Sequence, residues 1–413
     1  MGGLPRELTP AAHARIRRQL VLLPAYVFLV YGWATLLARL PHDVPVHDFA
    51  HFYVLGTIAN SGDAHALYDM DAQAAVVQRV IPGFDPPFPP PYGPQVSLFF
   101  SPFARLSYTN ALRLWLFSTL VAYAGCSYAL WRVCPHLHDR PWSTVLLLAA
   151  SPALHFALGF EQASAIALLS VTAAFLALRA NRLFLAGMAI GLLAYKPPLG
   201  LAAAFVFVLA REWRIVIGAI TSVAAQFAAG GLYWGPAMLL RYIETLRLYV
   251  SGVLDRAPGM EPNKFQMHSW RAFFDLLGLP SHVALTVSLV ASLLTVIVAL
   301  KCWRARGPLA LRYAVFLLAT ILIDPHLYAY DLVLLTPAFL LLWDWGLAEP
   351  VERSPVNRRF LWLLYFCYFS PLFAPLALVA RVQVSVLALS LLGVVLALVI
   401  SAPRPPVRTV TPV

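Results

Sequence analysis

Long apolar runs separated by short polar segments make up most of the chain. A helix that crosses a bilayer needs about 17–25 predominantly apolar residues. Runs that meet or approach this length are found at 19–39, 110–131, 142–158, 162–179, 183–196, 198–210, 213–233, 283–301, 309–324, 327–345, 359–379 and 382–401. Lys196, Pro197 and Pro198 interrupt the pair 183–196 and 198–210, so we expect these two runs to be half-length or re-entrant. The pattern predicts an all-α polytopic membrane protein with about 10–12 transmembrane helices.

Two polar segments, 40–109 and 234–282, are much longer than the other connections. Six predicted spans separate them, so both are expected on the same side of the membrane, where they carry short helices. We expect a single transmembrane domain over 19–401. A tail at 1–18 and a tail at 402–413 then lie on the opposite side of the membrane.

The composition excludes an ordinary soluble protein. The chain is 60% hydrophobic and 12% charged, whereas soluble domains average about 25% charged residues. Its net charge is +11, but the arginines stand between apolar runs rather than in one patch, so nucleic acid is not an expected partner. Membrane lipids are the expected partners.

The distribution of Lys and Arg predicts the orientation. Cytoplasmic loops of membrane proteins carry an excess of these residues. Of the 30 in the chain, 19 lie on the side of the two tails and 11 on the side of the long loops. We therefore expect cytoplasmic tails and long loops outside, which in a cell inner membrane means facing the periplasm or exterior.

Candidate chemistry begins in the first long loop, in "PVHDFAHFYVLGTIANSG", where His47, Asp48 and His51 surround an expected helix start. Asp48 fits two roles, because Asp is a common helix N-cap and is also a proton acceptor. His47 and His51 have the spacing of a helical zinc site. However, Pro45 places His47 before the helix, so we expect no metal and no other cofactor.

Four further elements follow in order: "PPYGPQVSLFFSPFARL", "GFEQASAIALL", "LAGMAIGLLAYKPPLGL" and "DPHLYAYDLVLLTPAFLLL". Together with the segment from Asp48, this succession resembles glycosyltransferase family 87. These are membrane enzymes of the GT-C class and include phosphatidylinositol-mannoside mannosyltransferases. The resemblance covers about residues 45–345. One departure is that Phe160 and Glu161 separate Gly159 from Gln162, where the family usually has Gly next to Gln.

The resemblance implies a GT-C type helical bundle and a hexosyltransferase. Such an enzyme moves a hexose, here expected to be mannose, from a polyprenyl-phosphate carrier to a hydroxyl of a lipid or glycan acceptor. It also implies that Asp48 is the catalytic base and that His326 positions the donor phosphate or the acceptor. For His326 the alternative is a place at a wet interface, where Asp324 and Pro325 simply open a helix.

The residues fit such a reaction. A single carboxylate suffices for an inverting displacement, because the phosphate leaves without protonation, whereas glycoside hydrolysis usually needs two acids. The leaving phosphate needs a cation, and Lys196 is the leading candidate. Burying a Lys at the centre of a membrane-spanning helix costs roughly 2.5–3.5 kcal/mol, so a Lys in such a position usually has a functional role. The alternative is that Lys196 snorkels to the interface.

Four more residues are expected to contact donor or acceptor. Gln162 is placed to bond a sugar hydroxyl, and Tyr92 to contact the sugar from a proline-rich loop that is otherwise a spacer. Asp331 shares a helix face with Tyr328 at i and i+3. His51 lies one turn into the helix that follows Asp48.

A transporter or flippase of lipid-linked sugars is the main alternative function. Transporters of this size commonly show repeated halves with matching broken helices. The sequence has no such repeat, and its polar residues gather on one side. A third possibility is a non-catalytic anchoring subunit, but such a subunit does not need Asp48, Lys196 and His326 on one face.

Overall fold

The computed structural model describes residues 10–39, 48–82, 92–250, 264–348 and 355–402. Within these residues the chain is helical, and the only pairing of extended backbone is an isolated bridge between Met267 and Tyr328. This confirms an all-α polytopic protein. Helix α1 begins at Pro10, within the segment expected as a tail, because the helix continues ahead of its apolar part.

Seven helical segments are long and apolar enough to cross a membrane. They are Gln19–Ala38 within α1 (Pro10–Arg39), α5 (Tyr108–Trp131), α7 with α8 (Pro141–Ala149 and Pro152–Gly159), α12 (Trp213–Trp234), α15 (Ser281–Arg304), η6 with α17 (Ala329–Leu335 and Thr336–Leu347) and α20 (Val384–Ser401). Four shorter apolar segments accompany them: α9 (Ser164–Arg179), α10 with η3 (Leu183–Gly191 and Leu192–Tyr195), α11 (Pro197–Ala210) and α16 (Leu309–Ile323). Eleven of the predicted runs therefore correspond to these segments.

The remaining run, 359–379, is divided. It forms α18 (Pro355–Phe369), the 3₁₀ helix η7 (Ser370–Phe373) and α19 (Leu376–Ala380). Pro371 and Pro375 explain the division, because proline lacks the amide hydrogen that a continuous helix needs.

The pair 183–196 and 198–210 is short, as expected. Helix α10 ends at Gly191 and tightens into η3, and Lys196 leaves the helical conformation with φ −124° and ψ 87°. Pro197 then starts α11, a position that proline favours. This break places Lys196 at the turn between two half-length helices.

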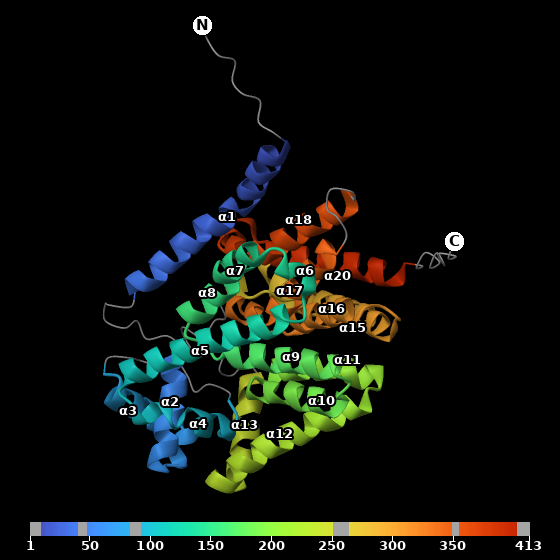
Figure 1. Ribbon diagram of the computed structural model, residues 1–413. Coiled ribbons are helices and arrows are strands. Elements are labelled where there is room, and N and C mark those ends of the chain that lie inside the picture. The colour runs from blue at the N-terminus through green and yellow to red at the C-terminus, as the bar shows by residue number, and fades with distance from the viewer. Residues whose placement is uncertain (1–9, 40–47, 83–91, 251–263, 349–354, 403–413) are drawn as a thin grey trace.

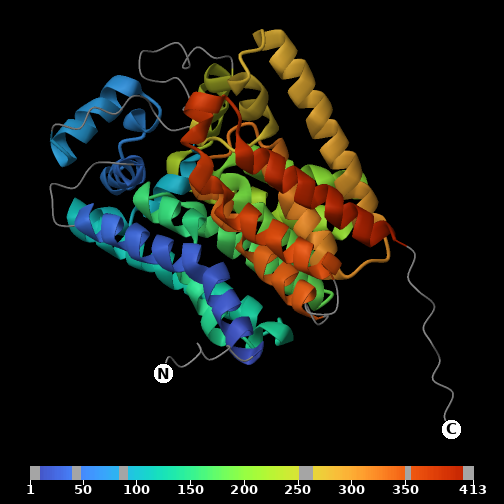
Figure 2. The same cartoon turned by 90° about the horizontal axis from the view of Figure 1, so that it is seen from above.

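The centre of the bundle is formed by α16 and by η6 with α17. Of the most apolar residues of Ala329–Leu347, 83% are buried, against 17% in Gln19–Ala38. Helices α5, α11, α15, α18 and α20 pack around this centre, and α1 lies on the outside of the bundle (Figures 1 and 2). The side chains that α1 exposes are large and apolar, as expected for a surface that faces lipid.

Short helices from both long loops lie together at one end of the bundle. They are α2 (Phe49–Ser61), α3 (Met70–Val80), α4 (Pro94–Phe100), α13 (Ala237–Val250) and α14 (Trp270–Leu276), with the small elements η1 (His65–Leu67), η2 (Phe103–Arg105) and η5 (Lys264–Gln266). Helices α2–α4 lie at the left of Figure 1. The rings of Tyr68 and Tyr242 are 5.9 Å apart and thus join the two loops. The short helix α6 (Pro135–His138) leads into α7.

Candidate active site

The side chain of Asp48 does not cap the helix that it precedes. Asp48 is the N-cap residue of α2, yet it has helical φ and ψ and its carboxylate accepts no hydrogen bond from that helix. Asp69, by contrast, accepts one from the amide of Ala72 at the start of α3, at 2.9 Å. The carboxylate of Asp48 instead accepts a hydrogen bond from Nε2 of Gln162 at 2.5 Å. Capping therefore does not account for this carboxylate.

Gln162 is held in place by the turn between α8 and α9. Glu161 has a positive φ of 58°, which reverses the chain between the two helices. Oε1 of Gln162 accepts a hydrogen bond from the amide of Ala163 at 3.2 Å. This fixes the amide group, so that its nitrogen points toward Asp48. The amide nitrogen of Gln162 thus donates to Asp48, and a hydrogen bond from Gln162 to a sugar hydroxyl stays a prediction.

Lys196 forms an ion pair with Asp331. The Lys196 side chain is 15% exposed and its ammonium lies 5.1 Å from the centroid of the Tyr330 ring. Asp331 is fully buried and also accepts hydrogen bonds from Ser164 Oγ at 2.9 Å and from the amide of Tyr328 at 3.2 Å. Lys196 therefore points into the protein and does not snorkel to the surface.

The two pairs, Asp48 with Gln162 and Lys196 with Asp331, belong to one group of side chains. Tyr330 interacts electrostatically with both Asp48 and Asp331. It is buried, and its ring stacks on that of Tyr328 with centroids 5.3 Å apart. The 3₁₀ winding of η6 brings Tyr328 and Asp331 to one face, because residues three apart eclipse in such a helix. Tyr330 was not singled out from the sequence.

The loop between α16 and η6 carries Asp324 and His326. Asp324 is fully buried, and its Oδ1 accepts a hydrogen bond from the amide of His326 at 2.9 Å. Burial raises the pKa of Asp324 to about 6, although Lys196 acts in the opposite direction. His326 itself is half-buried.

His51 and Tyr92 also lie near this group. Burial lowers the pKa of His51, while the nearby Asp48 opposes the shift, so the imidazole is neutral near pH 7. The ring of Tyr92 packs on Phe52, with centroids 5.0 Å apart. The side chain of Tyr92 also interacts electrostatically with Tyr330. The proline-rich segment before Tyr92 falls outside the described residues.

His47 and His51 have the sequence spacing of a helical zinc site. In the part of the chain that the structure describes, no group of three or more His, Cys, Asp or Glu side chains has metal-binding geometry. His47 lies outside that part.

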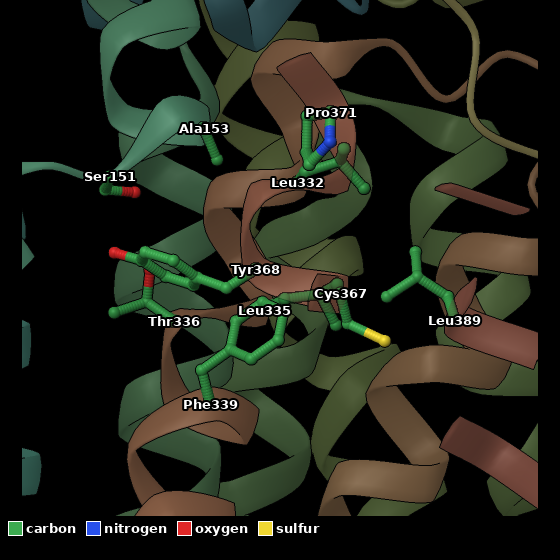
Figure 3. Close-up of a pocket in the computed structure, with 10 residues that line it drawn as sticks. All are labelled: Ser151, Ala153, Leu332, Leu335, Thr336, Phe339, Cys367, Tyr368, Pro371 and Leu389. Carbon is green, nitrogen blue, oxygen red and sulfur yellow. The ribbon is translucent and has the colours of Figure 1, made fainter. Parts of the chain in front are cut away.

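A small apolar cavity lies further along η6 and α17 (Figure 3). Leu332, next to Asp331, is one of its lining residues. Ser151, Thr336 and Tyr368 bring hydroxyl groups to one side of it, but each of these is already hydrogen bonded. None of the described residues that line the cavity is charged. It therefore lacks the groups that could act on a polar substrate.

The fold and these side chains define a multi-pass membrane protein with a polar, partly charged site at one end of an apolar helical bundle. The sequence model of glycosyltransferase family 87 matches residues 91–325, more than half of the chain. The protein belongs to this family and is a membrane-embedded glycosyltransferase of the GT-C type. No curated protein and no solved structure matches the chain. The match begins after Asp48 and ends before His326.

Proposed function

We propose that the protein transfers a hexose, with mannose the expected sugar, from a polyprenyl-phosphate carrier to a hydroxyl group of a lipid or glycan acceptor. The observation that carries the proposal is the carboxylate of Asp48, which leaves its own helix uncapped and is instead held by Gln162. A carboxylate oriented in this way fits a general base better than a structural residue. The donor class follows from the resemblance and from the place of the site at the end of an apolar bundle.

Asp48 acts as the base of a single displacement. Its Oδ2 accepts a hydrogen bond from Gln162, which orients the carboxylate. As the acceptor oxygen bonds to the anomeric carbon, the carboxylate of Asp48 takes the hydroxyl proton. The bond between that carbon and the phosphate oxygen breaks, and its electron pair leaves with the phosphate. The anomeric configuration is inverted. A positioned base contributes about 10²–10⁴-fold to such a step.

Lys196 supplies the positive charge for the donor phosphate. Its ammonium is already oriented by Asp331 and by the Tyr330 ring, so little side-chain freedom remains to be lost on binding. Asp331 accordingly serves to position Lys196. His326, Tyr92 and His51 complete the substrate-binding group. The test of this function is transfer of labelled hexose from polyprenyl-phosphate hexose by the purified protein.

The site faces the periplasm or exterior of the inner membrane in this proposal. The helices at the site end come from the two loops that are poor in Lys and Arg, while most of these residues lie in connections toward the opposite end. The transmembrane domain is taken to span 19–401, with both tails cytoplasmic.

Cysteine labelling tests this orientation. Ser61 is exposed at the end of α2, and Asp139 is exposed between α6 and α7. The four native cysteines are buried, so their background reaction should be low. We expect a membrane-impermeant thiol reagent added outside to label Ser61→Cys and to spare Asp139→Cys until the membrane is opened. The reverse result would place the site in the cytoplasm.

A further inference from the structure

Two buried carboxylates share one cation near the proposed donor site. Asp324 and Asp331 both interact electrostatically with Lys196, and both are fully buried. Asp331 forms an ion pair with it. The buried Oδ2 of Asp324 has no hydrogen-bond partner among the described residues. The site therefore holds one more buried acidic group than its cation can match.

The two carboxylates are not equivalent. Asp331 accepts hydrogen bonds from Lys196, from Ser164 and from the amide of Tyr328, and such bonds favour the charged form. Asp324 accepts a hydrogen bond at Oδ1 from the amide of His326, whereas its Oδ2 has no partner in the described part of the chain. If one of the two carboxylates has to become neutral, it is Asp324.

Donor binding creates that requirement. A sugar phosphodiester carries one negative charge, and in the proposed function it comes to Lys196. Lys196 would then face three anionic groups in a poorly hydrated environment, where like charges repel strongly. We propose that Asp324 takes up a proton from solvent when the donor phosphate binds and releases it when the phosphate leaves, so that donor affinity depends on pH through this residue. The inference rests on the proposed donor class.

Asp324 can take up and release this proton near neutral pH because its own ionisation lies close to that range. Burial raises its pKa to about 6 in the free protein, and the phosphate charge raises the pKa further. Between the pKa of the free protein and the higher pKa of the complex, binding of a donor takes up one proton from solvent, so affinity should fall with rising pH by up to about tenfold per pH unit. The titratable groups that face Asp324 from other elements are Lys196, Asp331 and Tyr195, and His326 lies on the same loop.

The variant Asp324→Asn tests proton uptake without disturbing the fold. Asn keeps the oxygen that accepts the His326 amide but cannot ionise. Binding of a short-chain isoprenyl methyl phosphodiester, whose charge is constant, would be measured in detergent between about pH 5.5 and 8. Wild-type affinity should fall with rising pH, while that of Asp324→Asn should stay level and exceed it at the upper end.

A matched control is Asp344→Asn. Asp344 accepts hydrogen bonds from the amides of His136 and Leu137, far from the site, and its variant should keep the wild-type slope. A wild-type slope in Asp324→Asn would overturn the inference and assign the pH dependence elsewhere, for example to His326. No binding by the wild-type protein at any pH would overturn the donor class as well, so the two failures are distinguishable.

Discussion

Replacing Asp48 with Asn should lower sugar transfer at least about 10²-fold, the lower end of what a positioned base contributes. The stability of the folded protein should not change. Asn can still accept the hydrogen bond from Gln162, and no capping bond is lost because Asp48 makes none. Turnover with saturating donor and the thermal unfolding midpoint in detergent would be measured together.

The same loop offers a matched control in Asp69. Its carboxylate does cap a helix, and Asn caps about as well as Asp, so Asp69→Asn should keep both transfer and stability. The Ala variants should separate the roles further. Asp69→Ala loses a cap worth about 0.5–2 kcal/mol, whereas Asp48→Ala loses none. Near-normal transfer by Asp48→Asn would remove Asp48 as the base.

Lys196→Met should weaken donor use and also destabilise the protein. Removing one partner of a buried ion pair costs about 3–5 kcal/mol, because Asp331 stays buried without its counter-charge. A loss of activity in Lys196→Met is therefore ambiguous by itself.

Two variants that both lack the Asp331 carboxylate separate the loss of donor binding from the loss of stability. The single variant Asp331→Asn keeps Lys196, and the double variant Lys196→Met with Asp331→Asn removes both charges. Hydrogen bonds to charged groups contribute about 1.5–3 kcal/mol, so the donor KM of the double variant should exceed that of Asp331→Asn about 10–100-fold. Equal KM values in these two variants would show that Lys196 does not contact the phosphate.

Much of the fold could be predicted because apolar length and proline position are local properties. The run lengths locate the helices, and Pro197 marks the break that leaves Lys196 at a turn. The hydropathy pattern could not show which runs lie at the centre of the helical bundle. The run 327–345 is long and apolar enough to cross a membrane and yet lies at the core, although its mean hydropathy of 1.3 is below the 2.0 of Gln19–Ala38. Tyr108–Trp131 has the same mean hydropathy of 1.3 with only 33% of its most apolar residues buried, so hydropathy alone does not separate contact with lipid from contact with protein.

Several residues that the structure brings together, Asp48, Gln162, Lys196 and Asp331, could be singled out from the sequence, but their pairing could not. Asp48 and Gln162 are 114 residues apart, and Lys196 and Asp331 are 135 apart, so no spacing rule joins them. The sequence equally permits Asp48 as a cap, because Asp is favoured at helix starts for that reason. Ser164, which bonds Asp331, lies only two residues after Gln162 in the family element but resembles an ordinary small residue at a helix start.

The most direct test of the proposed function is a comparison of donors. Purified protein would be incubated with an acceptor lipid extract and with labelled hexose carried either by polyprenyl phosphate or by a nucleoside diphosphate. We expect transfer from the polyprenyl-phosphate donor alone, with an inverted anomeric configuration in the product. Transfer from the nucleotide sugar, with none from the lipid-linked donor, would contradict the proposed function.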